Sequence, residues 1–245
     1  MTRAPVNRRD PSGTARLERA EIARQRALLR AYGEAMATVV TGDYDDKTGK
    51  LARLSDTLAD DLASATDEWM AKAEEASVRT SDRVLNNLHT GIQLGGISVP
   101  REEVELLRAG IQQNVRSIAG DLLRDVERIA ADGYTAGWSV DQTVRAINQA
   151  TDGQVARAET IVRTETLRVA DVCHKAAWDA AGCDGYLSYP TDDDRLCSKC
   201  LALATGGSGS SLKVYALDEP MALPWHPNCR CIRLPHFPDM EAIKI

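Results

Sequence analysis

Aromatic residues and long apolar runs are both scarce in this chain of 245 residues. Only 4% of the residues are aromatic, with a single Phe, so we expect helices packed through Leu, Val, Ile and Ala side chains. No apolar run approaches the roughly 20 residues that a membrane-spanning helix needs, and we expect no membrane partner. The opening residues also lack the apolar stretch of a secretory signal. We therefore expect synthesis in the cytoplasm, where reduced cysteines more often bind metals than form disulfides.

The chain as a whole carries no excess of positive charge. The net charge is −6, which argues against a protein that binds nucleic acid through its overall charge. The distribution is uneven, however: residues 1–30 hold eight Arg against three acids, which gives +5, and residues 31–100 hold twelve acids against six bases, which gives −6. The basic segment is either a solvated helix face, the simpler interpretation, or a contact with double-stranded DNA or an acidic partner. The arginines that would make such a contact are Arg3, Arg8, Arg9, Arg16 and Arg19.

Apolar residues spaced three and four apart predict a mainly helical protein. Residues 1–14, with Pro and Gly among charges, predict a flexible basic arm, and residues 15–98 a helical region. A further helix should open at Pro100. The two clearest stripes pair most simply as antiparallel helices. Their residues are Leu51, Leu54, Leu58, Leu62, Ala65 and Trp69, and then Val104, Leu107, Ile111, Val115, Ile118, Leu122, Val126 and Ile129.

The second half of the chain begins with a capping-box sequence and ends in a different composition. Ser139 and Gln142 predict the start of a short helix that ends near Asp152-Gly153, followed by a separate helix over about 154–181. Tyr186–Tyr189 and Lys213–Tyr215 are typical of short strands, and residues 206–211 form a Gly- and Ser-rich loop. A loop-rich module of this size has little apolar core, so a bound metal would stabilise it. The predicted fold class is therefore mainly α, with a long helical N-terminal region followed by a small α+β, loop-rich C-terminal module held together by a metal.

The C-terminal module contains four of the six cysteines and one of the four histidines. Thiolates and imidazole at such short spacings suit a tetrahedral soft-metal site, and Zn²⁺ is the leading candidate. Either the four thiolates form the site, or the histidine replaces one of the last two. The candidate ligands, of which four are needed, are Cys197, Cys200, His226, Cys229 and Cys231.

Five candidates for four positions favour a closed, structural site over a catalytic one, because a catalytic zinc keeps a position open for water. The residues around His226 and Cys197 do not match a zinc deaminase, and the preceding helices do not supply a thioredoxin-like setting. We assign no catalytic residue. Cys173, His174 and Cys183 are interpreted as packing residues.

Two further groups of polar residues accompany the cluster. Asp192–Asp194 form either a solvated turn or, less simply, a divalent-cation site. Asp194 or Arg195 could orient the metal loop through hydrogen bonds. Arg163 and Glu165 lie within an otherwise apolar helix and are interpreted, with Asp194 and Arg195, as a structural polar network.

Three motifs in this order resemble the Mu F-like phage head morphogenesis family, the minor head proteins of tailed bacteriophages. They are R-T-E-T at residues 163–166, D-x-x-C-x-x-C ending at Cys200, and H-P-N-C-R-C at residues 226–231. The likeness assigns residues 99–245 to a head morphogenesis domain whose zinc-binding module covers about 186–235. It implies a virion protein, not an enzyme, made in the host cytoplasm and incorporated in few copies near the portal. The implied partners are the portal protein, major capsid or scaffolding proteins, and packaged double-stranded DNA.

Two other classes of function are compatible with the residues. A metal-dependent hydrolase or nuclease would use Asp192–Asp194 with the cysteine cluster, and would require turnover that depends on Asp193 and an exchangeable metal. A cellular zinc-binding regulator of helical type would require a host partner in the absence of any virion.

Overall fold

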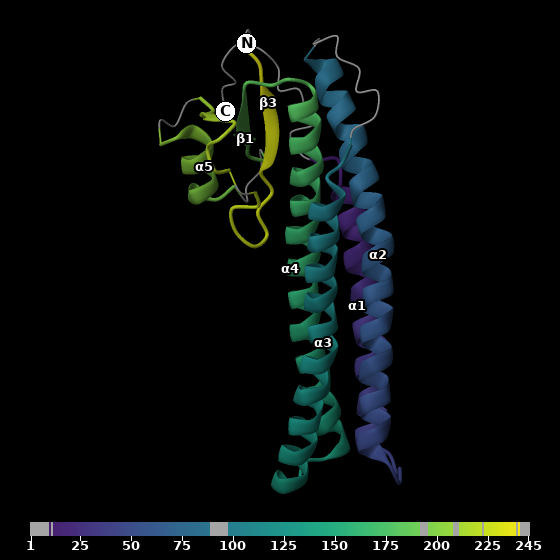
Figure 1. The fold of residues 1–245 in the computed structure, drawn as a ribbon. Helices are drawn as coiled ribbons and strands as arrows, with labels where there is room; N and C mark the ends of the chain where they lie inside the picture. The colour runs from purple at the N-terminus through teal and green to yellow at the C-terminus, as the bar shows by residue number, and fades with distance from the viewer. Residues whose placement is uncertain are drawn as a thin grey trace. The chain divides into compact units, whose positions relative to one another are not determined.

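The computed structural model describes residues 10, 12–88, 98–191, 196–207, 211–221, 223–238 and 240. Within these residues the chain forms a four-helix N-terminal region and a small C-terminal α+β module, which confirms the predicted fold class (Figure 1). None of the described helices is both long and apolar enough to cross a membrane. In chain order the elements are α1 (Ala15–Thr41), α2 (Lys47–Asn87), α3 (Arg101–Ala136), α4 (Val140–Ala180), β1 (Gly185–Tyr189), α5 (Ser198–Thr205), β2 (Val214–Ala216) and β3 (Ile232–His236).

The chain divides into two compact units, each assembled from segments that are distant in sequence. Unit 1 consists of Met1–Glu18, Met70–Leu107 and Arg163–Ile245, and unit 2 consists of Arg19–Trp69 and Arg108–Val162. The first four helices each contribute residues to both units.

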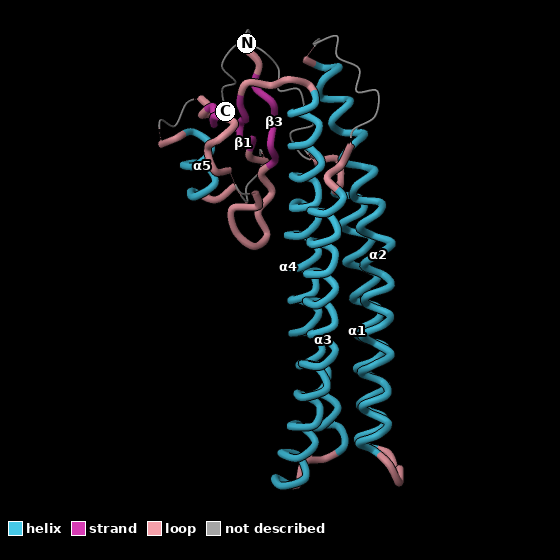
Figure 2. Tube along the Cα trace, viewed as in Figure 1, coloured by secondary structure: helices cyan, strands magenta, loops and turns pink. Residues whose placement is uncertain are grey.

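Unit 2 is a bundle of four helical segments (Figure 2). Residues 42–46 join α1 to α2 and residues 137–139 join α3 to α4, so the helices of each pair are antiparallel. The predicted stripes face the interior, because spacing of three and four places them on one side of each helix. Of the predicted stripe residues, Leu54 and Leu107 are only half-buried. The fully buried ones in unit 2 include Leu58, Leu62, Ala65, Val115, Ile118, Leu122 and Val126.

Ion pairs join neighbouring helices of unit 2 across its surface. Arg24 pairs with Glu68 at 2.7 Å, Arg30 pairs with Asp152 at 3.2 Å, and Arg26 pairs with Glu159. These three arginines of the basic opening segment therefore meet acids of α2 and α4. Exposed pairs of this kind each contribute about 0–1 kcal/mol, so they set the register of the helices more than their stability.

Helix α4 differs from the prediction of two helices separated near Gly153, and this prediction is wrong. The capping box is present: the Gln142 side chain accepts from Ser139 N at 2.7 Å, and Ser139 Oγ accepts from Gln142 N at 3.2 Å. The helix then continues without interruption to Ala180. A glycine inside a helix costs only about 1 kcal/mol, and no proline follows to break the hydrogen-bond ladder. Gly153 is therefore tolerated at an exposed position of a long helix.

Unit 1 contains a three-stranded antiparallel sheet with the order β2-β1-β3. Tyr186 of the central strand pairs with Tyr215 on one side and Pro235 on the other. One apolar core joins this sheet to helical residues, including Val84 and Leu85 of α2 and Trp178 of α4. Because the core draws on α2 and α4, the α+β module does not rely on its own few apolar residues. Ser12 and Thr14, from the end of the predicted arm, are also buried.

Candidate metal centre

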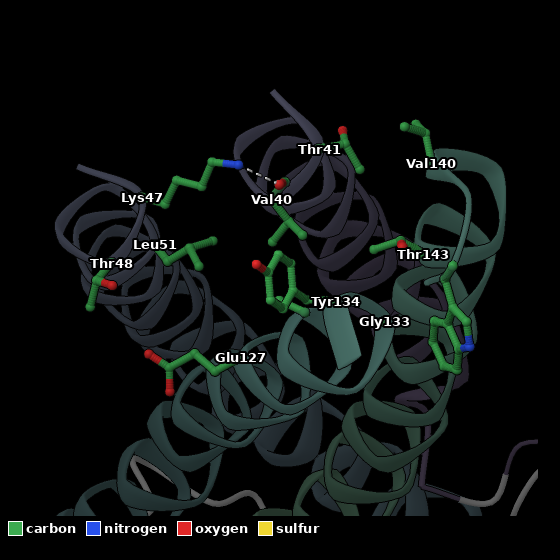
Figure 3. A pocket seen from close by; sticks show the side chains of 12 residues that line it. Val40, Thr41, Lys47, Thr48, Leu51, Glu127, Gly133, Tyr134, Val140 and Thr143 are labelled. Atoms are coloured by element: carbon green, nitrogen blue, oxygen red, sulfur yellow. Dashed lines mark hydrogen bonds between the residues drawn. The ribbon is translucent and has the colours of Figure 1, made fainter. Parts of the chain in front are cut away.

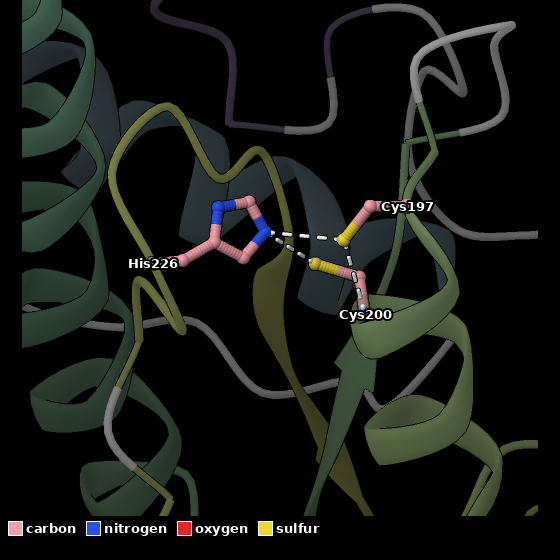
Figure 4. Close-up of side chains that lie close together, drawn as sticks. All are labelled: Cys197, Cys200 and His226. Carbon is pink, nitrogen blue, oxygen red and sulfur yellow. Dashed lines mark hydrogen bonds between the residues drawn. The ribbon is translucent and has the colours of Figure 1, made fainter.

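The start of α5 positions the first two cysteines of the cluster. Cys197 is the N-cap of α5, and its sulfur accepts from Cys200 N at 3.3 Å. A sulfur in this position satisfies one of the backbone N–H groups that a helix start leaves unpaired. One turn of helix then brings the Cys200 sulfur to the same side. His226 Nε2 lies 3.2 Å from Cys197 Sγ and 3.1 Å from Cys200 Sγ (Figure 4).

The second pair of cysteines reaches the same place from the segment before β3. Asn228 adopts a left-handed conformation with φ of 60°, and Cys229 N donates to His226 O at 3.0 Å, which closes a turn. The turn brings Cys229 Sγ to 3.7 Å from Cys200 Sγ. The ligand atoms fall into two groups within 4.8 Å that share Cys200: one also holds Cys197 and His226, the other Cys229 and Cys231.

These distances fit a tetrahedral zinc ion. Two sulfurs at about 2.3 Å from such an ion stand about 3.8 Å apart, and a sulfur and a nitrogen ligand stand about 3.6 Å apart. The separation of 3.7 Å between Cys200 Sγ and Cys229 Sγ matches the first value, and the separations of 3.1–3.2 Å between His226 Nε2 and the sulfurs of Cys197 and Cys200 are shorter than the second. All six cysteines are free thiols. The donor types are those of a structural zinc site, and they do not choose between the four-thiolate set and a set with His226. Each group within 4.8 Å holds three ligand atoms, so a four-coordinate ion would need the two groups to draw together around Cys200.

Three of the five candidate ligands are buried, whereas Cys197 and His226 are partly exposed. Cys200, Cys229 and Cys231 are at most 3% exposed and belong to the apolar core of unit 1. The cavity among the ligands has a volume of about 20 Å³, enough for little more than one water. A catalytic metal needs room for both water and substrate, so this cavity favours a structural role.

Hydrogen bonds within the cluster prepare its atoms for a metal. The Cys231 thiol donates to its neighbours, which raises its own pKa and lowers the pKa of Cys229 to about 5. The same donation lowers the pKa of Cys200. His226 donates from Nδ1 to Pro227 O at 2.7 Å, which leaves Nε2 facing the sulfurs. Fixing the tautomer through the distal nitrogen is the usual arrangement for a histidine ligand.

Neighbouring polar side chains hold the loop that carries the last three ligands. Asn228 N donates to Thr164 Oγ1 on α4 at 3.1 Å, and Thr191 Oγ1 donates to Arg230 O at 2.7 Å. Trp225 Nε1 donates to Ser188 Oγ at 3.1 Å. Thr164 belongs to R-T-E-T and Asn228 to H-P-N-C-R-C, so this bond joins two of the three motifs directly.

The charged residues of R-T-E-T make local ion pairs. Arg163 Nε lies 3.4 Å from a carboxylate oxygen of Glu18, and Glu165 accepts two hydrogen bonds from Arg168. Burial raises the pKa of Glu18 despite the nearby guanidinium groups of Arg163 and Arg230, and burial likewise raises the pKa of Glu165 despite Arg168. Asp192, Asp193, Asp194 and Arg195 lie outside the described residues.

The other cysteines and the histidine singled out in the sequence belong to no group of metal-binding side chains among the described residues. Cys173 and Cys183 are buried, and neither belongs to a group that could hold a metal among the described residues. His174 is also buried and stacks on Trp178 with ring centroids 5.8 Å apart. Arg3, Arg8 and Arg9 lie outside the described residues, whereas Arg16 and Arg19 are exposed.

Two residues that support the site were not recognised in the sequence. Thr164 contacts the ligand loop, and Glu18 faces Arg163 from the beginning of α1. A threonine buried in a helix and an acid among arginines have no distinctive local pattern. The only available signal was the polar run 163–166 inside an apolar helix, which indicated that this face meets another part of the chain.

The chain has no counterpart in the three comparisons. No protein-family model, no curated protein and no solved structure matches it. The likeness to phage head proteins therefore depends on the order of the three motifs alone.

Proposed function

We propose that the protein is a minor capsid and head morphogenesis protein of a tailed bacteriophage, incorporated in few copies near the portal. Its role is to bind other virion proteins during head assembly, without catalysis. The portal protein and major capsid or scaffolding proteins are the proposed partners. The metal-binding module of about residues 186–235 is a structural part of this assembly protein.

One observation carries the proposal: residues of the three motifs contact one another although they are far apart in sequence. Thr164 of the first motif holds the backbone at Asn228 of the third, and the cysteines of the second and third motifs meet. This linkage explains why the motifs would occur together and in this order. It is the kind of constraint that a structural domain imposes, because each part is needed for the others to be correctly placed.

A zinc ion in this cluster would supply folding free energy, since its ligands come from α5 and from the loop before β3. Cys197 and Cys200 would hold it from one side, and two of His226, Cys229 and Cys231 from the other. The buried position and small cavity leave little room for a reacting substrate. These features support a structural metal over a hydrolytic one.

Mass spectrometry of purified particles tests the proposed function. We expect the chain in procapsids and mature heads at a copy number far below that of the major capsid protein. Its presence only outside particles would contradict the proposal. Metal-dependent turnover that is lost in Asp193→Ala would favour the hydrolase or nuclease instead.

Contact with packaged DNA is a separate part of the proposal and concerns Arg3, Arg8, Arg9, Arg16 and Arg19. If these residues bind phosphates, the affinity for double-stranded DNA should fall steeply as salt increases, because counterions are released on binding. Binding that does not change with salt would remove DNA contact from the proposal and leave the assembly role intact.

A further inference from the structure

The connected ends of the helices in unit 2 form an open pocket of about 590 Å³ (Figure 3). Its walls come from the end of α1, the start of α2, the end of α3 and the start of α4, so both helix connections border it. Apolar and aromatic side chains line much of it, together with the carboxylate of Glu127 and the ammonium group of Lys47. The lining residues include Leu51, Glu127, Gly133, Tyr134, Trp138 and Val140.

The pocket exposes large apolar side chains in a protein that has few of them. Tyr134 is 91% exposed, Val140 is 58% exposed and Trp138 is 39% exposed. The chain contains only four Trp, six Tyr and one Phe. Trp and Tyr are enriched among the residues that dominate protein–protein binding, because they bury a large area with little loss of side-chain freedom.

The backbone holds Trp138 in a fixed position at this site. Trp138 N donates to Gly133 O at 2.8 Å and Gly137 N donates to Tyr134 O at 3.3 Å, with Gly137 at φ of 66°. This pattern is a Schellman motif, which ends α3 and rigidly places the next residue. A Cβ atom at Gly133 would lie 3.1 Å from Trp138 Cε3, so the indole packs directly on the glycine. The aromatic wall is therefore formed before any partner binds.

Several carboxylates at this end of the bundle have no ion-pair partner among the described residues, although Asp46 pairs with Arg53 at 3.5 Å. Lys47 donates to Val40 O at 2.9 Å, and Lys50 lies 3.8 Å from the centroid of the Tyr44 ring. Glu127 lines the pocket and has no ion-pair partner among the described residues. The same is true of two exposed acids in the connection from α1 to α2, Asp43 and Asp45, and of Asp141 in the first turn of α4.

We propose that this pocket is a docking site for a partner protein that presents a basic, apolar peptide segment. An arginine or lysine of the segment would stack on Tyr134 or Trp138 and pair with Glu127, while its apolar residues would cover Leu51 and Val140. Charge complementarity favours this occupant over an acidic one, because four acids without an ion-pair partner in the described part of the chain (Glu127, Asp43, Asp45 and Asp141) outnumber Lys47 and Lys50 at this end of the bundle. The site needs neither the metal centre nor a role in a virion.

Fluorescence anisotropy with the full chain tests this docking site. The probe is a labelled synthetic peptide of alternating arginine and leucine, compared with peptides that carry glutamate in place of arginine or serine in place of leucine. We expect the arginine–leucine peptide to bind more tightly than both. Trp138→Ala should weaken its binding about tenfold and Glu127→Gln about threefold.

Asp56→Asn is the matched control, since Asp56 is an exposed acid of α2 outside the pocket lining. The affinity of this variant for the arginine–leucine peptide should equal that of the unaltered chain. Glu127→Gln is a conservative change at an exposed position, so it keeps the test valid even if Trp138→Ala reduces folding. The proposal would be overturned if the arginine–leucine peptide did not bind, or if the glutamate or serine peptide bound equally well. It would also be overturned if both variants bound the arginine–leucine peptide like the unaltered chain.

Discussion

Thr164 Oγ1 accepts a hydrogen bond from Asn228 N at 3.1 Å, which ties α4 to the loop that carries His226, Cys229 and Cys231. Thr164 is 8% exposed, whereas Asn228 lies at the surface, so the bond joins the interior of α4 to an exposed turn. The loop bends sharply at Asn228, where φ is 60°. A side chain of a long helix thus holds the backbone between the ligands in the position that the metal centre requires.

Removing this bond should weaken metal binding. Thr164→Val keeps the shape of the side chain but leaves Asn228 N–H unpaired, and such supporting bonds typically affect metal affinity about 10-fold to 100-fold. We expect a loss of about tenfold in competition with a chromophoric zinc chelator. Thr57→Val, on an exposed face of α2, is the matched control and should bind zinc like the unaltered chain. Equal zinc affinity of the two variants would show that Thr164 does not support the loop.

Substitution of the ligands one at a time should identify the four that bind. Cys200→Ser should cause the largest loss of zinc affinity, because Cys200 belongs to both ligand groups. His226→Gln, Cys229→Ser and Cys231→Ser distinguish the possible sets, since the one residue of the three that is not a ligand should leave tight binding intact when it is changed. Cys183→Ser is the control at a buried cysteine outside the groups. Bound zinc per chain, measured by mass spectrometry of metals, gives the answer, and retention of zinc by Cys200→Ser would contradict the site.

The buried histidine should make stability depend on pH. Burial, with a smaller effect from Arg233, lowers the pKa of His174 to about 4 from the usual 6.5. Its ring nitrogens have no hydrogen-bond partner among the described residues. The unfolded chain therefore binds this proton more tightly, and the free energy of unfolding should fall as the pH drops from 6.5 towards 4. The expected loss from this group is about 3 kcal/mol.

His174→Phe keeps an aromatic ring beside Trp178 and removes the titrating group. Chemical denaturation of both proteins at several pH values isolates its effect, because loss of metal at low pH is common to the two. We expect the variant to lose less stability between pH 6.5 and 4. Parallel curves would mean that His174 is solvated in the folded state.

A buried ion pair joins α4 to β3. Asp171 accepts from Arg233 Nε at 2.8 Å and from a terminal Arg233 nitrogen at 2.9 Å. Asp171→Asn would leave the arginine charge buried without its counter-charge, at a cost of about 3 to 5 kcal/mol. Asp60→Asn breaks the exposed pair with Arg116 and should cost under about 1 kcal/mol. The free energy of unfolding of each variant is measured by denaturant unfolding. Equal losses of this free energy in the two variants would contradict the expected difference.

The helical part of the fold was predictable because its information is local. The apolar spacing of α2 and α3 places Leu58 and Ile118 in the core, and Ser139 with Gln142 forms the predicted capping box. Gly153 was misread as the end of a helix. The low helix propensity of glycine considers this residue alone. The helical residues on both sides and the ion pair between Asp152 and Arg30 favour a helix that continues through Gly153.

Strand β3 could not be predicted, because its sequence carries contrary signals. Pro235 cannot donate to a ladder and Arg233 suggests an exposed position. The structure accommodates both: β3 lies at an edge of the sheet, and Asp171 neutralises Arg233 in the interior. The convergence of the ligands was predictable from their spacing, but the contacts from Thr164 and Glu18 depend on tertiary structure that no local pattern encodes.

X-ray absorption at the zinc edge of the purified full-length chain tests the closed metal centre most directly. We predict one tightly bound zinc per chain, with four sulfur or nitrogen ligands at about 2.3 Å for sulfur and about 2.0 Å for nitrogen, and no water. The number of sulfur ligands would also decide between the four-thiolate set and the set with His226. A chain that folds without bound metal, or a zinc with a water ligand and an open position, would contradict the structural metal centre.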